Sequence, residues 1–172
     1  MTALSAVVFA LSWWMGLYLA VRDPRKPALV LAAVGLCGFA TVVALDAIRM
    51  AGEVSAESLG RVEIYLVVLP GVAWFAVLME LARPHDAGGG RGRDVLLTAV
   101  VAAAAALGAN WAGSVDGPLR GGHWLVFAVI SGSTLAAMIL AVRRVGQPAR
   151  VAGVLAVATL FFALGNAIIV IP

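Results

Sequence analysis

Six apolar stretches, each about as long as a membrane is thick, dominate this sequence. A helix needs about 20 mostly apolar residues to cross roughly 30 Å of hydrocarbon. The stretches are Ala3 to Val21, Pro27 to Ile48, Val62 to Ala82, Asp94 to Gly113, His123 to Val142 and Arg150 to Ile171. Because they use nearly the whole chain, the sequence predicts a single transmembrane domain over residues 1–172, an all-α bundle of six helices that forms a polytopic integral membrane protein.

Composition excludes the other classes of protein. Hydrophobic residues make up 63% of the chain and charged residues 12%, against roughly 45 to 50% and about 25% in soluble domains. Disorder needs the opposite bias, and the lone Cys37 allows no disulfide framework. A membrane β-barrel needs alternating polar and apolar residues, whereas runs such as VVAAAAALGA are uniformly apolar.

The basic residues predict the orientation of the bundle. Of the 12 Lys and Arg residues, 9 fall in the first, third and fifth connectors and 3 in the second and fourth. The positive-inside rule places the odd-numbered connectors in the cytoplasm, so the amino terminus and Pro172 are expected outside. Since the basic residues lie in small groups at helix ends and form no single patch, nucleic acid is not an expected partner.

Small and polar residues at helical spacing indicate faces suited to helix packing, since close approach in a membrane depends on small side chains. Each such set is expected to face a neighbouring helix and to be shielded from lipid. The sets are Ser5, Ser12 and Gly16; Gly35 and Asp46; Ala99, Ala103, Ala106 and Asn110; and Thr159 and Asn166.

Several polar and aromatic side chains fall near the predicted outer surface. We expect them to line a shallow pocket that opens outward, because ionisable groups within membrane spans are costly and commonly functional. The candidate ligand-binding residues are Asp46, Glu63, Asn110, Trp111, His123 and Asn166.

A simpler interpretation stays open beside the pocket. In it Glu63, His123 and Trp124 are interfacial groups, the tryptophans form an aromatic belt, and Asp46 pairs with Arg49. Glu80, one turn before Arg83, is expected to form a local ion pair with it.

No motif in the sequence indicates catalysis, a metal or a cofactor. GxSxG, HExxH, CxxC and the P-loop pattern do not occur. The histidines His85 and His123 fall on opposite sides of the bilayer in the predicted topology, so they cannot ligate one ion. The chain is therefore expected not to be an enzyme, to have no catalytic residue and to bind no metal or cofactor.

Four segments resemble the membrane region of a known family. They are LSWWMGLYLAVRDPRKPALVLAAVGLCGFA, LPGVAWFAVLMELARP, GPLRGGHWLVFAVISGSTLAAMILAVRR and VLAVATLFFALGNAIIVIP. Their order is similar to the first six helices of the N-terminal seven-helix sensor region of bacterial histidine kinases and related regulators. The resemblance implies a bundle in the bacterial inner membrane, with its amino terminus outside, that detects a lipophilic or extracellular signal without chemistry of its own.

The family's region has a seventh helix and effector modules, which this sequence lacks. The first functional hypothesis is therefore a non-enzymatic sensory or signal-coupling domain that acts through a missing effector or partner proteins. The alternatives are an accessory or structural subunit of a multi-subunit membrane complex and, second, a small-solute uptake component. The expected partners are membrane lipid and other membrane protein subunits.

Overall fold

The computed structural model describes residues 2–52, 56–83, 90–115, 118–145 and 159. These residues form the helices α1 (Thr2–Arg22), α2 (Pro27–Ala51), α3 (Ala56–Leu81), α4 (Arg91–Ala112) and α5 (Gly121–Val145), and none of them lies in a strand. Each of the five helices contains a segment long and apolar enough to cross a membrane. The prediction of an all-helical fold is thus confirmed for the described residues, and the five helices have the length and apolar character expected of a multi-pass membrane protein. The sixth predicted span, 150–171, lies outside the described residues apart from Thr159.

Most of the helices extend beyond the apolar stretches that predicted them. The largest difference is in α3, which begins at Ala56, whereas the stretch begins at Val62. An apolar stretch measures the hydrocarbon of the membrane, and a helix can continue into the polar interface, where its backbone still forms internal hydrogen bonds.

Local sequence explains where several helices begin and end. Pro27 occupies the first turn of α2, where its missing N–H leaves no donor unused. Gly52 and Gly113 follow α2 and α4 with φ of 74° and 83°, and the N–H of each bonds back to a carbonyl of the last turn. Gly52 has the left-handed conformation of the usual glycine stop of a helix, and the positive φ of Gly113 also favours glycine.

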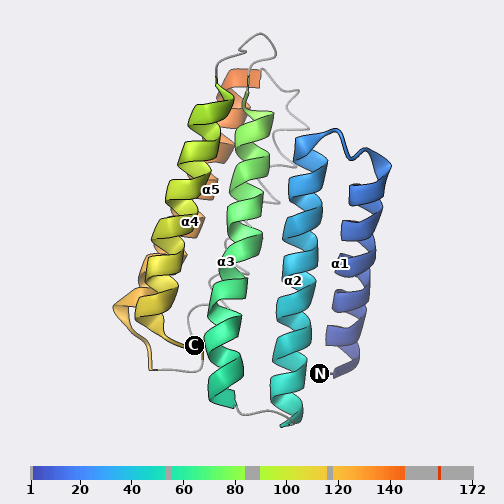
Figure 1. The fold of residues 1–172 in the computed structure, drawn as a ribbon, viewed down its shortest axis with the longest axis vertical. Coiled ribbons are helices and arrows are strands. Elements are labelled where there is room, and N and C mark those ends of the chain that lie inside the picture. Colours follow the sequence, from blue (N-terminus) through green and yellow to red (C-terminus); the bar gives the residue numbers. More distant parts are fainter. Residues whose placement is uncertain (1, 53–55, 84–89, 116–117, 146–158, 160–172) are drawn as a thin grey trace.

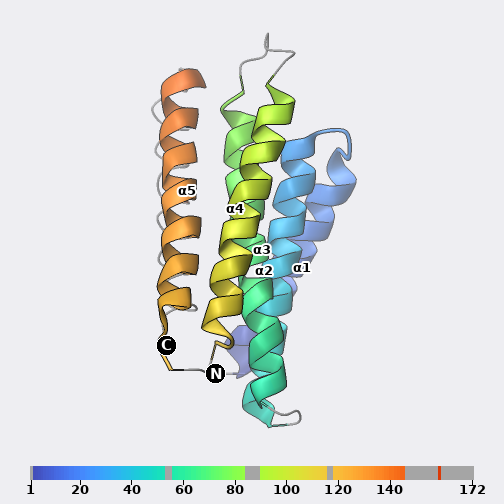
Figure 2. The ribbon, with the colours of Figure 1, turned by 60° about the vertical axis from the view of Figure 1, so that its left-hand side comes forward.

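The helices run up and down, with α3 at the centre. In Figure 1, α1 to α4 stand side by side and α5 lies behind α4. Helix α3 packs against α2, α4 and α5, whereas α1 packs against α2 alone among the described helices. Figure 2 shows α4 between α5 and the α1–α2 pair from the side. We call the end that holds the amino terminus the lower end, as it stands in Figure 1, and the opposite end the upper end.

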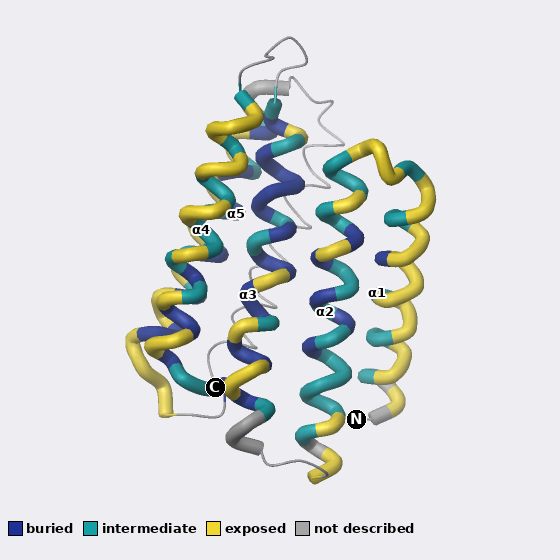
Figure 3. Tube along the Cα trace, in the orientation of Figure 1, coloured by how far each residue is buried: buried dark blue, intermediate teal, exposed yellow. Residues whose placement is uncertain are grey.

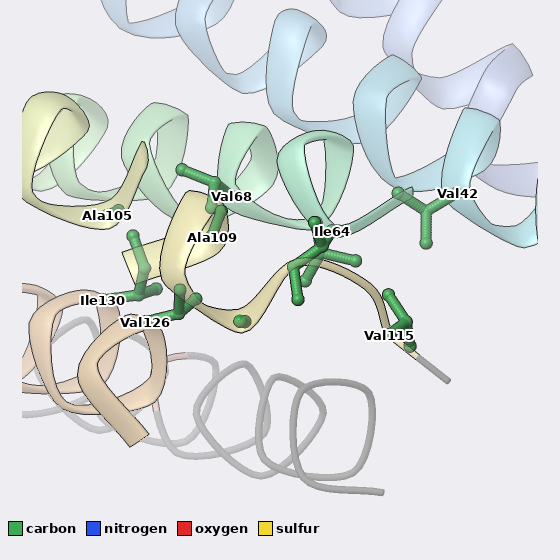
Figure 4. Packing of buried hydrophobic residues seen from close by; sticks show 10 residues of the cluster. Val42, Ile64, Val68, Ala105, Ala109, Val115, Val126 and Ile130 are labelled. Carbon is green, nitrogen blue, oxygen red and sulfur yellow. The ribbon is translucent and has the colours of Figure 1, made fainter. Parts of the chain in front are cut away.

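Burial follows this arrangement. Figure 3 shows buried positions concentrated along α3 and exposed positions along α1. A large cluster in the lower half includes Val42, Ile64, Val68, Val126 and Ile130, several of which are shown in Figure 4. A smaller cluster around Leu78 fills the upper half. Since α3 has neighbours on three sides, it is the helix that holds the bundle together.

Glycines bring the helix backbones into close contact. Gly16 of α1 lies against Cys37 and Ala33 of α2, and Gly35 of α2 lies against Ala73 of α3. Gly122 of α5 lies against the backbone of α4. The prediction that Gly16 and Gly35 face neighbouring helices is therefore confirmed.

The packing face predicted for α4 is wrong. Ala99, Ala103 and Asn110 are exposed, and Ala106 is only partly buried. The inward face consists instead of Ala105, Gly108, Ala109 and Ala112. In the run AVVAAAAALGA of α4, small residues occur on every face of the helix. Their spacing could therefore not distinguish the face that packs from the face that does not.

Candidate functional site

An arginine at the lower end contacts two carboxylates, one on its own helix and one on the next helix. Arg49 of α2 lies with Nη2 2.6 Å from Oδ1 of Asp46 on the same helix, and with Nε 3.6 Å from Oε2 of Glu63 on α3. The predicted pairing of Asp46 with Arg49 is confirmed. The Arg49–Glu63 contact between helices adds a link that the local pattern did not predict.

The helix positions explain why these three groups meet. Asp46 and Arg49 are three residues apart in the last two turns of α2, so they share one face. Glu63 lies about two turns into α3, which returns antiparallel beside α2 after a short connector. The charged groups therefore lie at the same depth, close to the lower end.

Glu63 is the most deeply enclosed acid at this site. Its side chain is 2% exposed, that of Arg49 is 16% exposed and that of Asp46 is 42% exposed. Removing a carboxylate from water costs several kcal/mol unless a cation and hydrogen bonds compensate it. The enclosed Glu63–Arg49 pair is thus sensitive to any change that moves α2 relative to α3, whereas Asp46 is open to water.

A second polar contact joins α3 to α4. The hydroxyl of Tyr65 donates a hydrogen bond of 3.2 Å to Oδ1 of Asn110, and both residues are exposed. Asn110 therefore lies at the edge of the α3–α4 interface. The amide oxygen at this position accepts a hydrogen bond without entering the core.

The tryptophans at the lower end lie on the outside. Trp111 and Trp124 are both exposed, and the Trp111 ring covers Gly121 at the start of α5. Trp124 packs edge to face on Phe127 with ring centroids 6.4 Å apart. Exposed tryptophans at a helix end are typical of an aromatic belt at the membrane interface.

His123 is buried and holds the connector between α4 and α5. Its Nδ1 accepts the N–H of Arg120 at 3.1 Å, and its Nε2 lies 3.0 Å from the carbonyl oxygen of Ser114. One neutral tautomer satisfies both contacts, with the proton on Nε2. His123 is the third residue of α5, and its side chain accepts the backbone N–H of the residue before the helix. This is one of the two hydrogen bonds of a capping box. Nearby, the N–H of Val115 bonds to the carbonyl of Gly60, which ties the connector to α3.

The structure thus brings some of the candidate residues into contact and leaves others separate. Asp46 and Glu63 share Arg49, whereas Asn110, Trp111 and His123 lie at the same end in contacts of their own. Asn166 lies outside the described residues. The outward pocket stays a prediction. Within the described ranges, no three His, Cys, Asp or Glu side chains gather closely enough to hold a metal ion.

A matching arginine network lies at the upper end. Arg83, two residues after α3, donates to Glu80 in the last turn of α3 and, from Nε and Nη2, to Oδ2 of Asp94 on α4 at 3.0 and 2.9 Å. The predicted Glu80–Arg83 pair is confirmed. The partner that sequence reasoning missed is Asp94, and its place in the first turn of the next helix was the available signal.

No family model, no curated protein and no solved structure matches this chain. Its function is therefore argued from its own geometry.

Proposed function

We propose that the chain is a non-enzymatic sensory or signal-coupling domain of the inner membrane, a six-helix bundle with its amino terminus, and so its lower end, outside. In this proposal a signal acts at the lower end, α3 carries it across the membrane, and partner proteins or an effector module receive it at the basic upper end. The observation that carries the proposal is that α3 is joined to a different neighbour at each end through an arginine network.

The two networks give α3 the means to couple the ends. At the lower end Arg49 connects α3 to α2, and at the upper end Arg83 connects α3 to α4. Between them α3 is enclosed by three helices. A packed helix shifts as a body more readily than it deforms, so a displacement at Glu63 is expected to alter the Arg83–Asp94 contact.

A signal needs a contact that can be broken at moderate cost. The 3.6 Å separation between Arg49 and Glu63 is longer than the 2.6 Å contact between Arg49 and Asp46. When the α2–α3 link opens, Arg49 keeps a partner on its own helix, whereas the enclosed Glu63 carboxylate loses a cation, a cost that the signal has to offset. This arrangement favours two states that differ in the position of α3.

The test measures whether the lower end affects the upper end. Glu63→Gln removes the charge with little change in shape, and hydrogen exchange followed by mass spectrometry of the full chain in nanodiscs reports on the backbone around Arg83 and Asp94. We expect exchange in that region to rise at least severalfold in Glu63→Gln, although the substitution lies at the other end of α3.

Asp46→Asn is the matched control, because it changes a carboxylate that pairs with the same arginine but lies on α2, the helix that carries Arg49. It should leave exchange at the upper end unchanged. Exchange that rises only around Glu63 itself would contradict coupling through α3 and favour a purely structural role.

A specific observation favours a second candidate, an accessory subunit of a larger membrane complex. Helix α1 contacts only α2 among the described helices and exposes large side chains along its length, among them Leu11, Trp14 and Leu17. Other membrane subunits could bind this surface.

Native mass spectrometry of the protein extracted from its own membrane in mild detergent separates the candidates. Constant association with other membrane subunits, together with loss of folded protein when they are absent, would favour the accessory role. A bound small solute on the isolated chain would instead favour uptake.

A further inference from the structure

The outward face of α1 carries a stacked series of rings that ends in a cation. Trp14 and Tyr18 stack with ring centroids 5.9 Å apart, and the guanidinium of Arg22 lies 5.9 Å from the centroid of the Tyr18 ring. The three residues are spaced by four, so they follow one face of the helix. From Trp14 to Arg22 the series rises about 12 Å at 1.5 Å per residue.

This face is open in the described structure. Trp14 is 65% exposed and Tyr18 is 49% exposed, and the neighbouring Val21 and Leu11 are exposed as well. Helix α1 is long and apolar enough to cross a membrane. Trp14 and Tyr18 lie within that apolar segment, and Arg22, in the last turn of α1, ends it.

The charges around Arg22 favour an anion. Asp23 pairs with Lys26 at 3.3 Å and accepts a hydrogen bond from the backbone N–H of Arg25. In the part of the chain that the structure describes, Arg22 has no carboxylate partner, and Arg25 is exposed beside it. The turn from Arg22 to Lys26 therefore holds three cations and one acid, a net charge of +2.

We propose that this face of α1 binds one anionic phospholipid in the leaflet at the upper end. The phosphate accepts hydrogen bonds from the guanidinium of Arg22, with Arg25 adding positive charge, and one acyl chain lies along Tyr18 and Trp14. Arginine matches the planar, bidentate geometry of phosphate oxygens, and the aromatic rings offer a rigid apolar surface directly below it. This site goes beyond the proposed sensory function and does not depend on it.

The test is native mass spectrometry of the full chain in a lipid-free detergent, titrated with phosphatidylglycerol or with phosphatidylcholine of the same acyl chains. We expect phosphatidylglycerol to bind the wild-type chain more tightly than phosphatidylcholine. Arg22→Gln should weaken the binding of phosphatidylglycerol about fivefold, the effect of one interfacial cation. Arg120→Gln removes an exposed cation at the lower end and is the matched control, which should bind as the wild type does.

Circular dichroism of both variants verifies that they are folded to the same extent. Equal binding of the two lipids by the wild type would overturn the proposal, and so would equal loss of binding in Arg22→Gln and Arg120→Gln. Inorganic phosphate in excess should leave the bound phosphatidylglycerol in place, since it cannot use the ring surface. Displacement of the lipid by phosphate would assign the site to a free anion and refute the lipid.

Discussion

Replacing Gly122 by alanine tests the closest approach to another backbone at any described glycine. A Cβ at this position would lie 2.5 Å from the carbonyl oxygen of Gly108 and 2.7 Å from the carbonyl carbon of Trp111, and nearer still to the backbone nitrogen of Ala112. All three are backbone atoms of α4. A change of rotamer cannot relieve the overlap, so α5 has to move away from α4.

The size of the effect follows from that movement. Heavy atoms that are not bonded to each other rest about 3.5 Å apart, so a start at 2.5 Å requires a shift of about 1 Å. A gap of that size removes a quarter to a half of the dispersion energy of each contact across the interface. Overpacking commonly costs about 1 to 3 kcal/mol. Because the shift also pulls on the hydrogen bonds of the adjacent His123, we expect a loss of about 3 kcal/mol, the upper part of this range.

Gly132→Ala is the matched control on the same helix. Gly132 is exposed, and a Cβ there meets nothing within 4 Å. Alanine is the better helix former by about 1 kcal/mol, so this variant should be slightly more stable than the wild type. The two identical chemical changes are thus expected to have opposite signs.

The assay is reversible unfolding in mixed micelles by a denaturing detergent, followed by circular dichroism, with the free energy of unfolding compared between the two variants. The expected difference is about 4 kcal/mol, the sum of the two effects. Variants that unfold within about 1 kcal/mol of each other would refute the close α4–α5 contact on which the reasoning depends.

Two further substitutions test polar contacts, one at each end of the bundle, and a third serves as a comparison. His123→Ala leaves the N–H of Arg120 without its acceptor in a partly buried contact and should lower the free energy of unfolding by about 1 to 3 kcal/mol, with faster hydrogen exchange in the α4–α5 connector. Unchanged exchange there would contradict the capping role. Arg83→Gln leaves Asp94 without its cation on a side chain that is largely enclosed and should cost about 1 to 2 kcal/mol in the same unfolding assay. Lys26→Gln, which breaks a largely exposed ion pair, should cost under about 1 kcal/mol, and an equal loss in both would show that enclosure adds nothing to the Arg83 pair.

The local ion pairs could be predicted, whereas the pairs between helices could not. Asp46 and Arg49 are three residues apart on one helix, and Arg83 follows Glu80 by the same spacing just after α3 ends, so local spacing alone brings each pair together. The contacts from Arg49 to Glu63 and from Arg83 to Asp94 depend on how α2, α3 and α4 are rotated about their axes. That rotation is set by packing over the whole helix and leaves no signal in the spacing of single residues.

His123 shows the same limit in another form. Its type and its place near a helix end suggested a ligand-binding or interfacial group. In the structure both ring nitrogens are used to hold the α4–α5 connector, and the side chain is fully buried. The contact of the ring with the Ser114 carbonyl joins the start of the connector to α5, a contact that the residue types in the connector did not predict.

The sequence by itself determined that the chain is helical, that its helices are long and apolar enough to cross a membrane, and that most of its basic residues lie in alternate connectors. These properties are local, because a span in lipid has to satisfy its backbone hydrogen bonds within its own helix, and about 20 apolar residues suffice for that. The tertiary structure alone decided which face of each helix packs. Helix α4 has small residues on every side. Its inward face was selected by the contact of Gly108 with α5 and by the packing of α4 against α3. Packing in a membrane lacks a hydrophobic force between helices and depends on close fit, and fit is a property of two surfaces, which the residues of one helix do not specify.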